Sequence, residues 1–219
     1  MEKGNWNDIH LKIQEEIKNI FKDYNLNKLS KYEIRKVIFN YLCNSLKYDY
    51  ELLEKIKQFN LSRKNGINDI NTVLVRNPYL EFKSVMDNKI GICNSISQYY
   101  KILLEEVGIK AYCVVTDDGT EVLHQLTMIY DEDKDTYSFD DITSVIVDRG
   151  DMSAFFDYDL EMANSLNQGN KEIFDGDNWV ILQEEYVNYV VGRTSSKYEI
   201  LAKLPSNISM VKSKNSYNI

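Results

Sequence analysis

The sequence has 219 residues, of which 43% are hydrophobic and 12% aromatic, and its formal net charge is −8. This length supports one good hydrophobic core, and only two prolines and nine glycines argue against a low-complexity linker. Lysines and arginines are scattered along an acidic chain, which disfavours a general nucleic-acid binder because such proteins usually present a basic face. We see no internal repeat or change in composition, so we predict a single domain over residues 1–219.

The chain also has no feature of membrane insertion or secretion. No apolar h-region follows the initial methionine, and no apolar run approaches the roughly 18 residues of a membrane span. The three cysteines, Cys43, Cys93 and Cys113, form no CxxC pair, and their odd number fits a reducing cytoplasm. The two histidines lie far apart, so we expect no metal site and no cofactor. We therefore expect a cytoplasmic protein that contacts neither membrane nor nucleic acid.

The first third of the chain is predicted to be helical. Residues 9–21 place four apolar side chains on one helical face, and the apolar spacing continues in two further segments. A polar loop follows, and then an apolar segment leads to Cys93. The predicted segments are helices over 9–21, 31–45 and 50–59, a loop over 63–71 and the approach over 78–88.

The segment after this approach predicts a helix that begins at or next to Cys93. Apolar residues recur at helical spacing from Ile96 to Val107, and Gly108 is placed as a helix-ending glycine. The N-terminus of a helix carries partial positive charge and unpaired N–H groups, which favour a thiolate. Cys93 is therefore a candidate nucleophile. Cys43 and Cys113 lie among apolar residues and are most simply core cysteines.

The remainder of the chain predicts an antiparallel meander. Turn-rich residues separate three strand candidates, at 109–116, 121–131 and 135–142. The pattern weakens after Val147, where we expect helices near 157–166 and 178–191 and a last strand at 198–203. Helices followed by an antiparallel sheet indicate an α+β fold.

A histidine and an aspartate share the apolar faces of these strands. His124 alternates with Leu126 and Met128, whereas Asp141 alternates with Phe139. A carboxylate on an apolar face is costly without a partner, and His124 is the obvious one. Held by Asp141, the imidazole could activate Cys93 as in other cysteine nucleophile sites. The neighbouring Asp140 is the alternative acid.

Each of these residues also has a structural explanation. A lone cysteine is most often a core residue, a histidine on an apolar face is usually a satisfied core side chain, and an aspartate beside a turn is usually solvated. Their order and their placement on compatible elements favour catalysis.

The chain resembles the transglutaminase-like superfamily of papain-type cysteine enzymes, particularly its bacterial thiol-protease branch. The resemblance covers residues 32–162, with a C-terminal elaboration over 163–210. Its motifs are the segment from Tyr32 to Tyr48-Asp49, which resembles the family's leading helix, the Gly91-Ile92-Cys93 sequence and its helix, His124 at the second strand, and Asp141-Ile142-Thr143. The family often has an aromatic residue and an asparagine where this chain has Leu126 and Thr127, and a glycine and an aromatic residue at Ser95 and Ile96.

The resemblance implies a papain-like core in which the nucleophile helix packs on an antiparallel sheet. It implies acyl transfer on peptide or side-chain amides through Cys93, His124 and Asp141, most simply hydrolysis by a thiol protease or amidase. The substrate would be a protein or a peptide. Crosslinking or deamidation by a transglutaminase is an alternative, and so is a non-catalytic binding module, which the residues after His124 favour.

Overall fold

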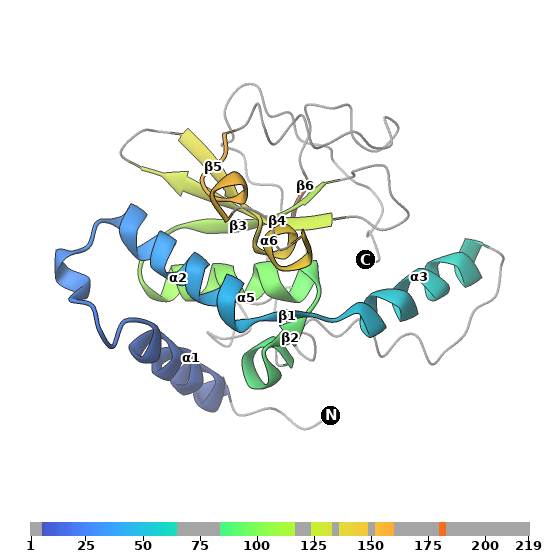
Figure 1. Ribbon diagram of the computed structural model, residues 1–219, viewed down its shortest axis with the longest axis horizontal. Coiled ribbons are helices and arrows are strands. Elements are labelled where there is room, and N and C mark those ends of the chain that lie inside the picture. Colours follow the sequence, from blue (N-terminus) through green and yellow to red (C-terminus); the bar gives the residue numbers. More distant parts are fainter. Residues whose placement is uncertain are drawn as a thin grey trace.

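The structure, a computed structural model, describes residues 6–64, 84–116, 124–132, 136–148, 152–159 and 180–182. Helices and strands are mixed in an α+β arrangement, in which helices α1, α2 and α5 lie to one side of a four-stranded sheet (Figure 1). Among the described helices, none is long and apolar enough to cross a membrane.

The N-terminal helices match the predicted segments closely. They are α1 (Trp6–Ile20), the 3-10 turn η1 (Leu26–Lys28), α2 (Lys31–Ser45) and α3 (Tyr50–Lys64). Helix α2 begins at the capping residue Ser30, whose hydroxyl accepts from the Glu33 N–H while the Glu33 carboxylate accepts from the Ser30 N–H. Helices α1 and α2 pack against α5, whereas α3 projects away from the rest of the described structure (Figure 1).

A short parallel pair fixes the approach to the cysteine helix. Strand β1 (Lys47–Tyr48) pairs with β2 (Ile90–Gly91), and residues 84–88 before β2 are helical. Gly91 is needed here because a Cβ at this position would collide with the side chains of Val85 and Ser95. The pair therefore positions Cys93, two residues later.

Helix α5 (Cys93–Glu106) is the central element of the core. Eleven of its residues are buried, including Tyr99, Tyr100 and Leu103, and it packs against α2 on one side and the sheet on the other. The helix ends as predicted, because Gly108 has a φ of 78° and the Ile109 N–H returns to the Leu104 carbonyl.

The main sheet has the strand order β5–β4–β3–β6, and all its pairs are antiparallel. Its strands are β3 (Ala111–Thr116), β4 (His124–Asp131), β5 (Thr136–Asp140) and β6 (Val180–Leu182). One face of the sheet contacts α5 and joins the helical core through Ala111 and Ile129. The opposite face carries a second apolar cluster of Val114, Leu126, Met128, Phe139 and Tyr158.

Two segments differ from the sequence prediction. The third strand ends at Asp140 rather than at residue 142, because α6 (Ile142–Asp148) starts there, followed by the 3-10 turn η3 (Met152–Phe155). Val180–Leu182 is a strand paired with β3, not part of a helix over 178–191, since its apolar residues complete the sheet edge. Most of the loop at 63–71, most of the helix at 157–166 and the strand at 198–203 lie outside the described residues; residues 157–159 are not helical.

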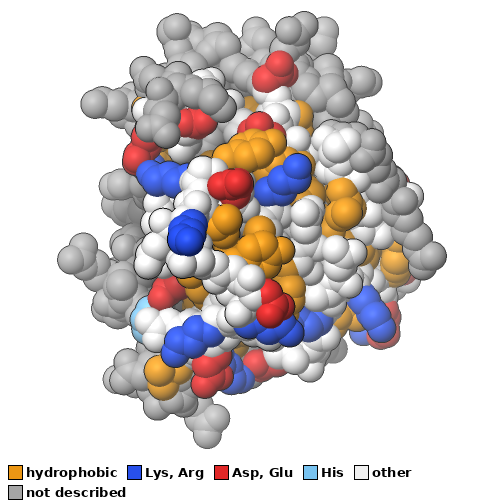
Figure 2. Space-filling view, turned by 60° about the vertical axis from the view of Figure 1, so that its left-hand side comes forward, with side chains coloured by type: hydrophobic (Ala, Val, Ile, Leu, Met, Phe, Trp, Pro, Cys, Tyr) orange, Lys and Arg blue, Asp and Glu red, His pale blue; other side chains and the backbone are white. Residues whose placement is uncertain are grey.

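The surface is mixed in character. On the face drawn in Figure 2, hydrophobic side chains reach the surface in a group bordered by basic and acidic side chains. Of the described residues, the exposed large hydrophobic side chains are Leu11, Tyr24, Tyr32, Tyr50, Val147 and Met152.

Candidate active site

Cys93 occupies the first position of α5. The preceding residue, Ile92, has an apolar side chain and makes no side-chain cap to the first turn. Instead, the Ser95 hydroxyl accepts from the Ile92 N–H at 3.1 Å and so closes the turn in front of the helix. The first-turn N–H groups are therefore left without a capping side chain, which is the arrangement that favours an anion at a helix N-terminus.

His124 opens β4 and reaches both other candidate residues. Its Nε2 atom lies 2.7 Å from Oδ2 of Asp141, and Cys93 is near enough for its charge to act on the imidazole. With Nε2 bound to the carboxylate, Nδ1 is the ring nitrogen left for the thiol. The imidazole is therefore bound to the carboxylate of Asp141 and is under the influence of Cys93.

Electrostatics favour an ion pair between His124 and Asp141. Burial by itself would lower the pKa of His124, but the charge and hydrogen bond of Asp141, and then Cys93, raise that pKa well above its usual value. Burial would raise the pKa of Asp141, but His124 and Ser144 lower it. The two shifts agree in describing an imidazolium facing a carboxylate.

Asp141 is held from several directions. It stands one residue before α6 and caps that helix, since Oδ1 accepts from the Ser144 N–H at 3.0 Å and Oδ2 from the Ser144 hydroxyl at 2.7 Å. Its own N–H donates to the Phe155 carbonyl at 2.9 Å. The side chain is 4% exposed, so its orientation toward His124 is fixed by the protein and not by solvent.

Asp140, the alternative acid, has a different set of partners. Its carboxylate accepts hydrogen bonds from Nε and Nη2 of Arg35 at 2.7 and 2.6 Å, and from the Tyr100 hydroxyl at 2.7 Å. The Asp157 N–H is a further donor, at 2.8 Å. Arg35 and Asp140 are both buried, at 5% and 1% exposure, so this is a charged cluster inside the core.

Sequence reasoning missed a polar network beside the cysteine. Gln125 is 2% exposed and its amide donates to the Ser97 hydroxyl at 2.7 Å, while its carbonyl oxygen accepts from the Asn94 amide at 3.2 Å. Gln98 donates to the Asn94 side-chain oxygen at 2.9 Å. The network ties the first two turns of α5 to β4 and so fixes the spacing between Cys93 and His124. A polar Gln125 inside an apolar strand was the signal that could have revealed it.

The sequence pattern indicated Tyr48 as part of the Tyr48-Asp49 motif but did not indicate that it lies near Cys93. It lies on β1 opposite Gly91, and burial, followed by the charges of Cys93, Tyr50 and Asp141, raises its pKa. The phenol is therefore close enough to the candidate site to sense its charges. Within the described part of the chain, no three His, Cys, Asp or Glu side chains gather as a metal site would need.

The chain was compared with known proteins. No family model matches it, and no curated protein matches it. Among solved structures, one described as the crystal structure of a TGase overlaps 63% of this chain, with a TM-score of 0.45 and 21% sequence identity. The overlap spans 33% of that chain, about a third of its length. The likeness is a coarse one of fold.

Proposed function

We propose that this protein is a cysteine-dependent acyl-transfer enzyme that acts on peptide or side-chain amides, with hydrolysis as its main reaction. The observation that supports it is the 2.7 Å contact of His124 Nε2 with Asp141, together with the place of Cys93 at the start of α5, where its charge acts on His124. A helix N-terminus, an imidazole and an orienting carboxylate are the parts needed to activate a thiol.

In this proposal the Cys93 thiolate attacks the carbonyl carbon of the substrate amide. The N–H groups at the start of α5 stabilise the negative oxygen that forms. His124 gives its proton to the nitrogen as the carbon–nitrogen bond breaks, so an amine leaves and a thioester remains on Cys93. Water, deprotonated by His124, then attacks the thioester, releases the acid and restores the thiol. Asp141 holds the ring orientation throughout.

The proposal is tested by trapping the acyl-enzyme. The chain is mixed with p-nitrophenyl acetate, release of p-nitrophenol is followed, and the acetylated residue is located by mass spectrometry. We expect a burst of p-nitrophenol and acetylation of Cys93, lost in Cys93→Ser and strongly reduced in His124→Gln. Cys113→Ser is the matched control, because Cys113 is a buried cysteine of β3. No acetylation of Cys93 would favour the non-catalytic binding module.

Crosslinking and hydrolysis differ in what accepts the acyl group from the thioester on Cys93: an amine in crosslinking, and water in hydrolysis. Casein is incubated with the protein and a fluorescent primary amine such as monodansylcadaverine. Casein fragments without attached amine are the result expected of a protease. Amine attached to intact casein would instead assign the thioester to transfer onto lysine-like amines.

A further inference from the structure

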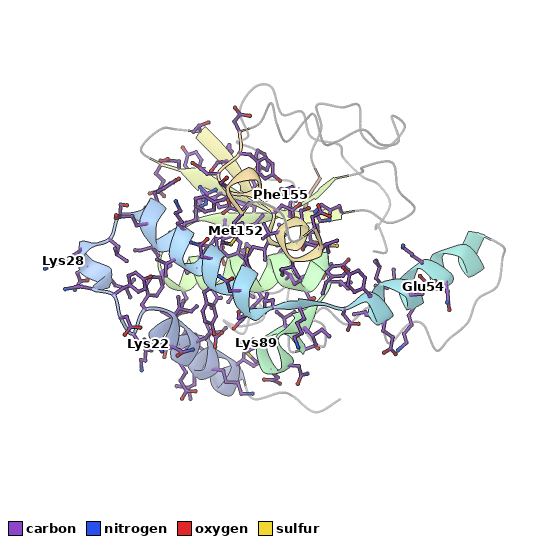
Figure 3. The ribbon with its side chains drawn as sticks, in the orientation of Figure 1. Lys22, Lys28, Glu54, Lys89, Met152 and Phe155 are labelled. Carbon is purple, nitrogen blue, oxygen red and sulfur yellow. The ribbon has the colours of Figure 1, made fainter. Side chains whose placement is uncertain are left out.

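A pocket of about 510 Å³ opens between the end of α2, strand β1, helix α6 and turn η3. Most of the residues that line it are apolar or aromatic, among them Leu46, Tyr48, Tyr50, Val145, Val147 and Met152, whereas Asn44 and Lys47 add polar surface. Figure 3 labels Met152, the contribution of η3. This volume falls within the usual range for small-molecule and side-chain pockets, roughly 300–1,000 Å³.

The pocket adjoins the candidate active site through two of its walls. Tyr48 pairs with Gly91, two residues before Cys93, and the charges of Cys93 and Asp141 are among those acting on its phenol. On the other wall, α6 follows Asp141 directly and contributes Val145 and Val147 one and two turns later. The strand that pairs with the approach to Cys93 and the helix that follows Asp141 therefore both line the pocket.

The character of the lining points to an apolar occupant. Tyr50, Val147 and Met152 line it and are 59%, 38% and 38% exposed, which makes them half of the exposed large hydrophobic side chains described. The rings of Tyr48 and Tyr50 lie 5.0 Å apart in an edge-to-face arrangement and form an aromatic wall. The charged residue in the described lining is Lys47. Exposed apolar side chains gathered in one concavity are typical of a binding site.

We infer that this pocket receives an apolar or aromatic side chain of the peptide substrate, close to the amide that Cys93 attacks. The inference rests on the proposed function and adds a substrate class to it. A bulky apolar residue seated against Tyr48, Val147 and Met152 would hold the neighbouring peptide bond near the start of α5. Burial of that side chain supplies binding energy without a charged contact.

The test uses reagents that carry the candidate side chain to Cys93. N-(3-phenylpropyl)iodoacetamide and N-methyliodoacetamide alkylate thiols by the same displacement of iodide, but only the first has an aromatic group. The ratio of their second-order rates with Cys93 is measured and divided by the same ratio for free N-acetylcysteine. In the native protein we expect this corrected ratio to be about ten, which is the discrimination that one apolar group in a pocket provides.

Two pocket variants and one control variant show whether the raised ratio depends on the pocket. Val147→Gln combined with Met152→Gln makes the lining more polar without adding charge, and Val147→Trp narrows the pocket. Both should return the corrected ratio toward unity while the N-methyliodoacetamide rate is unchanged. Leu11→Gln alters an exposed apolar residue of α1 outside the pocket, 56% exposed, and should leave the ratio as it is. Circular dichroism of each variant verifies folding at these exposed positions.

The outcomes separate the inference from the proposed function. Fast alkylation of Cys93 by both reagents with a corrected ratio near unity, or a high ratio that survives both pocket variants, would overturn the inference and leave the proposed function standing. Slow alkylation of Cys93 by both reagents would overturn the two together. A high ratio lost in both pocket variants and kept in Leu11→Gln supports the substrate class.

Discussion

The carboxylates of Asp140 and Asp141 are adjacent in the chain and bind different cations: Asp140 is paired with Arg35, and Asp141 with His124. The end of β5 and the start of α6 meet between them, so one carboxylate faces the helical core and the other faces the candidate active site. Two neighbouring residues of the same type therefore have separable effects.

Asparagine substitution should distinguish the two acids. Asp141→Asn removes the charge that holds the His124 imidazolium, so Cys93 acetylation by p-nitrophenyl acetate should fall by at least about 100-fold, the lower range for loss of acid–base catalysis. Asp140→Asn should keep most of the acetylation rate per folded molecule. The opposite ranking would assign the orienting role to Asp140.

The loss of stability should be larger in Asp140→Asn than in Asp141→Asn, the reverse of the order expected for acetylation. Asp140→Asn removes the more deeply buried of the two carboxylates paired with Arg35, and breaking a buried ion pair in this way costs on the order of 3 kcal/mol or more. Arg35 also donates to Ser138 and Asp157, which limits the loss. Urea unfolding followed by circular dichroism measures both variants, and a smaller loss of unfolding free energy is expected for Asp141→Asn. A loss in Asp140→Asn no larger than that in Asp141→Asn would contradict the ranking.

Cys93 should be the fast thiol of the protein. Burial, with the charges of Asp140 and Asp141, raises the pKa of Cys43 to about 12, and Cys113 is 1% exposed inside β3. Brief treatment with iodoacetamide at pH 6–7 should therefore label Cys93 first, and His124→Gln should slow that labelling. Peptide mass spectrometry identifies the labelled residue, with Cys43→Ser as the matched control. Preferential labelling of Cys43 or Cys113 would contradict the assignment.

The ion pair of His124 and Asp141 also predicts how stability depends on pH. A raised histidine pKa adds stability that is complete below the ordinary value of 6.5 and is lost as pH rises through the folded pKa. A lowered aspartate pKa adds stability that is complete above 3.8 and is lost as pH falls through the folded pKa.

The contribution of the pair should therefore be greatest between pH 3.8 and 6.5. We expect the difference in unfolding free energy between the native protein and His124→Gln to be largest in that window and to shrink on the alkaline side. Urea unfolding at several pH values measures it. A difference that does not change with pH would show that His124 stabilises the fold through packing alone.

Gly91 offers a test of the geometry in front of the cysteine. An alanine methyl group at this position would press on the side chains of Val85 and Ser95, and Ser95 closes the turn before α5. Gly91→Ala should cost about 1–3 kcal/mol of stability, as overpacking usually does, and should slow Cys93 alkylation. Gly108→Ala is the comparison, because a Cβ there meets no neighbour and its penalty comes from the positive φ alone. Unchanged alkylation in Gly91→Ala would show that the turn adjusts.

Much of this arrangement could be predicted from sequence because it depends on local patterns. The helix from Cys93, its glycine end and the strands around His124 follow from apolar periodicity and turn residues. The end of β5 was missed because Asp141 acts as a helix cap, and a capping aspartate and a strand aspartate look alike in an alternating pattern.

The faces of the sheet were harder to predict. Alternation assigned the apolar face of β4 to the core, yet the face that contacts α5 carries the polar Gln125 and Thr127. Asp140, which alternation placed away from the core, is buried because α2 supplies Arg35 to it. Such partners come from distant parts of the chain, and periodicity within one strand contains no information about them. The pairing of β1 with β2 is nonlocal in the same way.

That parallel pair has a consequence for how the candidate site around Cys93 assembles. Lys47 and Ile90 are neighbours in space but are separated in sequence by α3 and the segment after it, so a long loop must close before the two strands meet. Contacts of this kind form late in folding because the loss of chain entropy precedes the gain from pairing. His124 comes from yet another hairpin. If the proposed function holds, we expect Cys93 to keep ordinary thiol reactivity until β1 and β2 have paired and β4 has docked, and pulsed alkylation during refolding measures when its reactivity changes.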